Sequence, residues 1–137
     1  MVFRGGTVIG TQSIGASDFA VLREVGTGSW HGRRHQGPGS GTVMRAAVPG
    51  LAFDGLGAHY AVSKAFAANA ASLAVSRKLG YRDDWIARQV SRGQPAELRR
   101  LRMDRATWQA RRAAGDPLAG PVRIDGLEPC LPMFGLL

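Results

Sequence analysis

Glycine constrains this chain more than any other residue, because 19 of its 137 residues are glycine and they divide it into short segments. The glycines show no collagen-like period. No apolar run between them approaches the roughly 20 residues that a membrane-spanning helix requires. The pattern therefore favours a globular protein built from short strands and helices, and it predicts no membrane association.

Composition places the chain among single-domain globular proteins. Hydrophobic residues make up 45% and charged residues 20%, both near globular averages. The length predicts one domain over residues 1–137. The single cysteine, Cys130, excludes an intramolecular disulfide and a cysteine-built zinc site, and it fits a reducing cytoplasm. His31 and His35 stand four residues apart without an evident third ligand, so we expect no metal.

The chain is strongly basic, with 18 Lys and Arg against 10 Asp and Glu, a formal charge of +8. Such charge points to an anionic partner, either nucleic acid or a smaller ligand. The arginines are densest over residues 88–112, where only Trp85 and Trp108 flank them and no nucleic-acid motif accompanies them. We therefore interpret this run as a solvated face and keep nucleic-acid binding as a lesser alternative.

Hydrophobic periodicity and turn residues predict an α/β chain. Strands are expected over 8–14, 19–25, 59–63, 84–92 and 97–103, and helices over 42–53, 67–79 and 105–112. Thr42 is the expected cap of the first helix, which Pro49 should kink or shorten. Residues 26–41 are expected to form a glycine-rich connection, and residues 113–137 an extended tail.

One candidate site is the segment Gln36-Gly37-Pro38-Gly39-Ser40-Gly41-Thr42. Its glycines lie between a predicted strand and a predicted helix, where they let the backbone approach a ligand closely. The unpaired N–H groups and the dipole of the following helix favour a phosphate or pyrophosphate. The Walker loop and the dinucleotide fingerprint do not fit, since Thr42 stands where each needs another residue. The segment can equally be a surface loop.

A second candidate is the helix that contains Asn69 and Ser72, which lie one turn apart and share a face. Arg77 and Lys78 follow, and Gly80 and Tyr81 end the segment. This helix can present an amide and a hydroxyl side by side to a ligand. It can equally be an ordinary amphipathic helix that Asn69 caps and Gly80 stops.

Together the two segments resemble the GNAT superfamily of acyl-CoA N-acyltransferases. The family's pyrophosphate loop reads Q/R-x-x-G-x-G/A, which residues 36–41 match, and its following helix commonly reads N-x-x-S, then a basic residue, an apolar residue, Gly and an aromatic. Asn69, Ser72, Lys78, Gly80 and Tyr81 match that pattern. Later residues resemble the branch near ribosomal-protein N-terminal acetyltransferases. The resemblance implies a mixed, mostly antiparallel sheet flanked by helices.

The resemblance also implies a mechanism, in which an amine attacks the thioester of acetyl-CoA directly. Ser72 matches the position whose hydroxyl assists the departing thiolate, and Glu24, on the strand before the loop, is the candidate base. The residues implied in coenzyme A binding are Arg34, Gln36, Gly37, Gly39, Ser40, Gly41, Thr42, Asn69 and Ser72. The acceptor is an amine, either a protein N-terminus or a small molecule.

The chain departs from the family pattern at its N-terminal side, where the opening strand and the helices that build the acceptor side lack a counterpart before Val8. We therefore expect an N-terminally truncated fold, and an exposed sheet edge that can pair with another copy. Pro49 interrupts the helix of the pyrophosphate site. A relative that binds coenzyme A or a partner without catalysis is accordingly the alternative to an active N-acetyltransferase.

Overall fold

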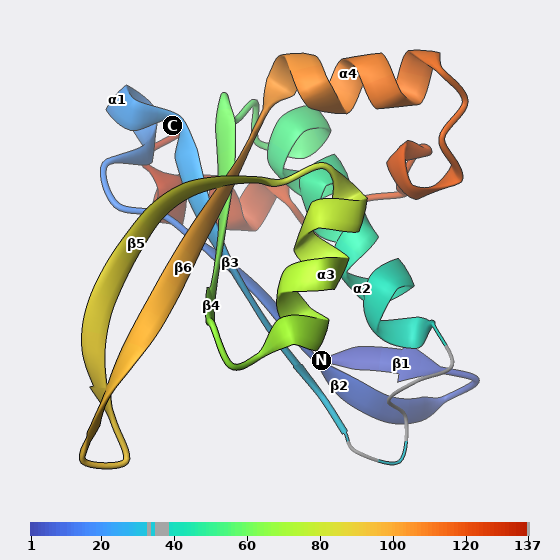
Figure 1. The fold of residues 1–137 in the computed structure, drawn as a ribbon. Coiled ribbons are helices and arrows are strands. Elements are labelled where there is room, and N and C mark those ends of the chain that lie inside the picture. The colour runs from blue at the N-terminus through green and yellow to red at the C-terminus, as the bar shows by residue number, and fades with distance from the viewer. Residues whose placement is uncertain (33, 35–38, 137) are drawn as a thin grey trace.

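The computed structural model describes residues 1–32, 34 and 39–136, and its centre is one six-stranded sheet in the order β1-β2-β3-β4-β6-β5 (Figure 1). All neighbouring strands are antiparallel except β3 and β4. The mixed, mostly antiparallel sheet expected from the resemblance is therefore confirmed. The strands are β1 (Val2–Arg4), β2 (Thr7–Gly15), β3 (Glu24–His31), β4 (Tyr60–Phe66), β5 (Arg82–Ser91) and β6 (Gln94–Asp104).

Two predictions for the N-terminal part were wrong: the strand over 19–25 and the glycine-rich connection that was expected to begin at residue 26. Phe19–Leu22 forms the short helix α1, and β3 runs from Glu24 to His31 through two glycines. The glycine-containing part of β3 forms a strand because it pairs with β2, from Gly26↔Gly15 to His31↔Gly10. A Cβ on Gly28 would lie 2.8 Å from Oγ of Ser13, so glycine permits this close pairing.

Strands β3 and β4 pair over only four residues, from Glu24↔Tyr60 to Thr27↔Ser63. Beyond Thr27, β3 keeps its pairing with β2, and beyond Ser63, β4 keeps its pairing with β6. Figure 1 shows the two strands diverging from this point, β3 towards α2 and β4 towards α3. The central sheet is thus open between two strands that are each anchored on their outer side.

Helix α2 (Ser40–Gly50) begins earlier than expected, because Gly39 and not Thr42 is its N-cap. Gly39 takes φ 81°, a left-handed conformation that glycine adopts without strain. Pro49 does not end the helix. The chain continues into a π-helical turn over Leu51–Gly55, a widening that fits the backbone hydrogen bond that proline cannot donate.

Helix α3 (Ala70–Leu79) follows β4 and has both predicted end signals. Asn69 caps its first turn, with Oδ1 accepting from the amide of Ser72 at 3.2 Å, and Gly80 closes it at φ 105°. The strands expected over 84–92 and 97–103 are β5 and β6, which begin earlier than expected and pair as a hairpin with its turn at Arg92 and Gly93, both at positive φ. These local signals were confirmed.

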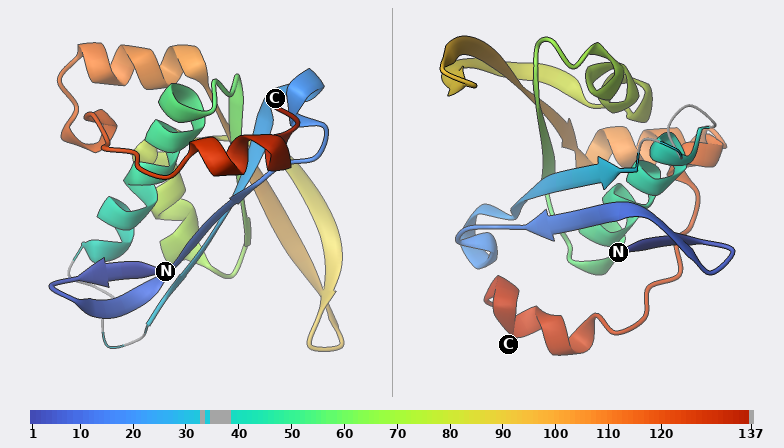
Figure 2. Two further views of the ribbon diagram at one scale, coloured as in Figure 1. Left: turned by 180° about the vertical axis from the view of Figure 1, so that it is seen from behind. Right: turned by 90° about the horizontal axis from the view of Figure 1, so that it is seen from below.

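The C-terminal residues are not simply extended. Helix α4 (Arg105–Ala113) is followed by 3₁₀ turns at Pro117–Ala119 and Glu128–Phe134. Figure 2 shows the last segment lying across β2 and β3 with the C-terminus near α1. There Phe134 meets Phe19 edge to face at 5.7 Å. This long-range contact holds a segment whose local sequence predicts no helix.

The main hydrophobic cluster joins the sheet to α2, α3 and α4. Its largest member is Trp108, buried beside Phe53 at a ring distance of 6.1 Å. From the central strands, the cluster includes Val25 of β3, Ala61 and Ala65 of β4, and Leu101 and Met103 of β6. Across the described residues, no helix is both long and apolar enough to span a membrane.

The cap of α4 gives a pH-dependent stability. The amide of Thr107 donates to Oδ1 of Asp104 at 2.7 Å, and this backbone hydrogen bond is the main reason why the pKa of Asp104 is lowered. Asp104→Ala should reduce the free energy of unfolding near pH 7 by about 1 kcal/mol, whereas Asp104→Asn, which keeps a capping oxygen, should lose less. Urea unfolding of all three proteins measures this difference.

A lowered pKa stabilises the fold above the unfolded value of about 4, and the stabilisation disappears as pH falls through the folded value. The advantage of the wild type over Asp104→Asn should therefore shrink below about pH 4. Equal stabilities of wild type and Asp104→Ala near pH 7 would contradict the cap.

Candidate functional site

The gap between β3 and β4 is a cavity of about 240 Å³. Its walls come from β3 and β4 at and beyond the end of their pairing, from Leu98 of β6, from the N-terminal turn of α3 and from one side chain of α2. The lining residues are Thr27, Gly28, Ser29, Arg45, Ser63, Lys64, Ala65, Phe66, Asn69, Ser72 and Leu98. An extended ligand entering here would lie along two strand edges that no neighbouring strand occupies.

A second cavity, of about 510 Å³, adjoins the first at the N-terminus of α2. It is lined by Gly39, Gly41, Thr42, Met44, Trp30, His31, Ala71 and Val75, and it shares Ser29, Arg45, Asn69 and Ser72 with the first. The two cavities together lead from the start of an 11-residue helix to the parted strands. The positive end of the helix favours a negatively charged group at the outer end of this path.

The structure brings three of the seven predicted loop residues to this path. Gly39, Gly41 and Thr42 line the second cavity, and Ser40 is the first residue of α2. Arg34 is exposed and lies outside the linings of both cavities. Gln36 and Gly37 lie outside the described residues. Of the loop residues that the structure describes, Gly39, Gly41 and Thr42 therefore lie on the path.

Asn69 and Ser72 line both cavities, as their shared helix face predicts. The capping interpretation of Asn69 is confirmed, because its oxygen accepts from the amide of Ser72. Capping uses the oxygen of the side chain and leaves the amide nitrogen as the group that Asn69 presents to a ligand.

Arg45 is a site residue that the sequence reasoning missed. One of its terminal nitrogens donates to the carbonyl oxygen of Ser72 at 3.0 Å and to Ser72 Oγ at 3.3 Å. The other donates to Ser63 Oγ at 3.1 Å and to Ser76 Oγ, and these two buried hydroxyls also lie within hydrogen-bond distance of each other. Two features of the sequence could have pointed to Arg45: it is a lone cation among apolar residues of α2, and two serines of α3, Ser72 and Ser76, are spaced four residues apart.

Burial perturbs two groups of this cluster. Desolvation lowers the pKa of Arg45 from its ordinary value. Desolvation also raises the pKa of Tyr81 to about 12, against smaller opposing effects of its side-chain hydrogen bond with Thr27 and of the Arg45 charge. The phenol is therefore neutral at physiological pH and gives Arg45 no counterion.

The predicted base, Glu24, lies on the other face of the sheet from Arg45. Side-chain alternation and register place Glu24, Lys64 and Arg100 on one face, while Ser63 points to α2 and α3. Glu24 Oε1 pairs with a terminal nitrogen of Arg100 at 2.9 Å. A cavity of about 360 Å³ on this face includes all three residues, and Lys64 also lines the cavity between the strands.

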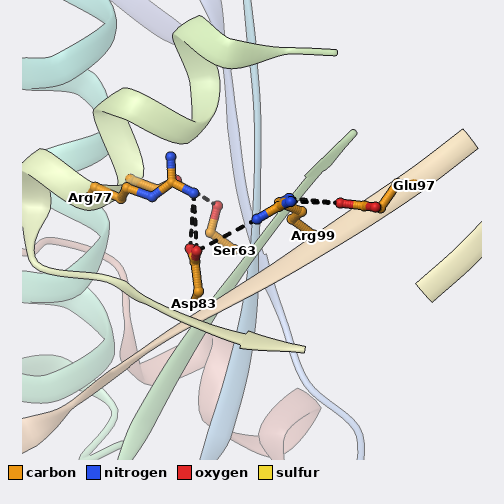
Figure 3. Close-up of polar contacts among 6 residues, drawn as sticks. Ser63, Arg77, Asp83, Glu97 and Arg99 are labelled. Carbon is orange, nitrogen blue, oxygen red and sulfur yellow. Dashed lines mark hydrogen bonds and ion pairs between the residues drawn. The ribbon is translucent and has the colours of Figure 1, made fainter. Parts of the chain in front are cut away.

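Many arginines of the basic run pair with acids instead of forming a uniformly free face. Figure 3 shows Asp83 between Arg77 and Arg99, with Arg99 also pointing to Glu97. The distances to Asp83 are 3.1 Å from Arg77 and 3.7 Å from Arg99. Further pairs join Arg100 and Arg102 to Asp84, Arg111 to Asp116, and Arg112 to Asp54. These pairings weaken the case for a nucleic-acid surface.

The sequence model of the acetyltransferase (GNAT) domain matches residues 1–82. The solved structure of yncA from Salmonella typhimurium, described with its cofactor acetyl-CoA, is 25% identical, with a TM-score of 0.66 over 72% of this chain and 59% of that one. A ribosomal-protein-alanine N-acetyltransferase from Brucella melitensis is 22% identical, with a TM-score of 0.67 over 75% and 65%.

A spermidine N-acetyltransferase from Vibrio cholerae, described as dodecameric, is 14% identical, with a TM-score of 0.71 over 77% of this chain and 63% of that one. At 22% and 14% identity, the comparisons with the Brucella melitensis and Vibrio cholerae enzymes concern the fold alone. The present chain spans 59% to 65% of the length of these three proteins.

The raised pKa of Tyr81 is directly measurable. In an ultraviolet titration, one of the two tyrosines should ionise only near pH 12. This late phase should vanish in Tyr81→Phe and remain in Tyr60→Phe, the matched control. Since an unfolded tyrosine ionises near pH 10, stability should fall as pH rises from about 10 to 12. A late phase that survives in Tyr81→Phe would contradict the assignment.

Proposed function

The chain belongs to the acetyltransferase (GNAT) family, and from that premise we propose that it transfers an acetyl group from acetyl-CoA to an amine. The observation that carries the proposal is the path formed by the two adjoining cavities. It joins a helix N-terminus, which suits a pyrophosphate, to a gap between strands, which suits an extended arm.

The residues along the path fit coenzyme A. The first free amides of α2, including those of Gly41 and Thr42, receive the pyrophosphate, and the amide nitrogen of Asn69 faces the pantetheine arm. Gly41 leaves the entrance clear, since a Cβ there would project towards His31 Nδ1, 3.7 Å away. Acetyl-CoA supplies a thioester whose carbonyl an amine can attack and whose thiol can leave.

The acceptor approaches from the face that carries Glu24, and it reaches the gap beside Lys64. Only a neutral amine is nucleophilic, so a base or a water chain must take the proton from its ammonium form. Glu24 is our candidate for that base, with Arg100 holding its carboxylate in place. Ser72 donates a hydrogen bond to the sulfur as the thiol leaves.

Calorimetry with coenzyme A and acetyl-CoA tests the binding site. Gly41→Leu should weaken binding at least about tenfold, because its side chain would enter the path, a change of roughly 1.4 kcal/mol. Gly15→Leu is the matched control, since a Cβ at Gly15 meets no atom within 4 Å. Absence of binding by the wild type would overturn the proposed function.

Thiol release tests catalysis with a panel of polyamines and peptides that carry free N-termini, chosen from the acceptors of the similar proteins. Ser72→Ala should lower kcat by about tenfold or more, the effect of losing roughly 1.4 kcal/mol of transition-state stabilisation. Ser91→Ala, at the end of β5, controls for the loss of a hydroxyl elsewhere. Tight coenzyme A binding without turnover on any amine would instead support the non-catalytic alternative.

A further inference from the structure

Arg45 carries a positive charge, and the groups that accept its hydrogen bonds are all neutral. Its terminal nitrogens donate to three serine hydroxyls and one carbonyl oxygen. Within residues 1–32, 34 and 39–136, no carboxylate forms an ion pair with it. Arg45 is partly buried, and withdrawing a cation from water without a counterion is costly, so this environment gains when negative charge arrives nearby.

The charge lies where the two cavities meet, and Arg45 lines both. The other titratable groups close to it are cationic or neutral. Lys64 lines the gap on β4, His31 lines the outer cavity on β3, and the Tyr81 phenol keeps its proton up to about pH 12. Negative charge that develops in this gap therefore meets no anion among the described lining residues.

Arg45 also sets the direction of the Ser72 hydroxyl. A serine hydroxyl has one proton to donate, and its oxygen accepts through its lone pairs. Because a guanidinium N–H of Arg45 points at Ser72 Oγ from 3.3 Å, the hydroxyl proton must point away from Arg45. A hydroxyl that accepts from a cation is also a stronger donor to its own partner.

We propose that Arg45 is a positioning residue that directs the Ser72 hydroxyl proton to the leaving sulfur and stabilises the thiolate charge. In the reaction, the carbon–nitrogen bond forms, the carbon–sulfur bond breaks and the sulfur departs with the bonding electron pair. The excess proton of the nitrogen passes to the base, while Ser72 holds the thiolate by a hydrogen bond. This inference rests on the proposed acetyltransferase function.

The test measures the thiol pKa of bound coenzyme A from the ultraviolet absorbance of the thiolate as pH is raised. Bound to the wild type, the thiol should titrate about one pH unit below free coenzyme A, a tenfold stabilisation of the thiolate. Arg45→Gln should abolish this shift and lower kcat about tenfold or more. The affinity of Arg45→Gln for coenzyme A near pH 7 should stay within about threefold of the wild-type affinity, since the thiol is protonated at that pH.

Two variants separate charge from geometry. Arg45→Lys should retain part of the shift, because lysine keeps the charge but not the paired donors. Ser72→Ala should abolish the shift although Arg45 remains. Arg88→Gln, on exposed β5, is the control that removes the same charge elsewhere. Coenzyme A bound to this variant should show the same thiol pKa as coenzyme A bound to the wild type. Thermal unfolding monitors the fold of each variant, and Ser72→Ala decides the matter if Arg45→Gln does not fold.

The possible failures are distinct. Normal coenzyme A binding and acetylation with an unshifted thiol pKa would overturn the role of Arg45 alone. A shift that persists in Arg45→Gln or in Ser72→Ala would overturn it as well. Absence of coenzyme A binding by the wild type would overturn the proposed function and this inference together.

Discussion

The early end of pairing between β3 and β4 is the constraint on which the site depends. Four residue pairs tie the two strands, and each strand then follows its outer neighbour. The backbone between them would be an unfavourable internal edge if nothing filled it, since unpaired N–H and C=O groups require partners. A ligand that supplies those partners gains binding energy from a gap that the fold already holds open.

Polar contacts, as well as apolar ones, hold the helices around this gap. Arg45 of α2 reaches Ser72 and Ser76 of α3 and Ser63 of β4, so that one guanidinium joins three elements. Tyr81 and Thr27 extend the polar contacts towards β3. Buried polar networks have well-defined geometry because each donor must meet an acceptor. The gap therefore has a rigid wall on the side of α2 and α3.

Features set by local chemistry could be predicted from the sequence, and features set by distant contacts could not. Asn69 and Gly80 mark the ends of α3 through their own side chain and backbone, and the β5–β6 hairpin follows from its turn. Strand β3 was missed because its glycines disfavour a strand until β2 pairs with them. Arg45 was missed because its partners lie 18 to 31 residues away along the chain.

The position of Lys64 has a consequence for the order of events. This residue lines the gap and also the cavity on the opposite face of the sheet. In the proposed reaction, acetyl-CoA in the gap and an acceptor in the opposite cavity would reach Lys64 from different sides, so neither ligand would have to leave before the other enters. Access alone imposes no compulsory sequence of arrival or departure, so any ordering in turnover has to arise from the energetics of binding, such as charge placed by one ligand for the next.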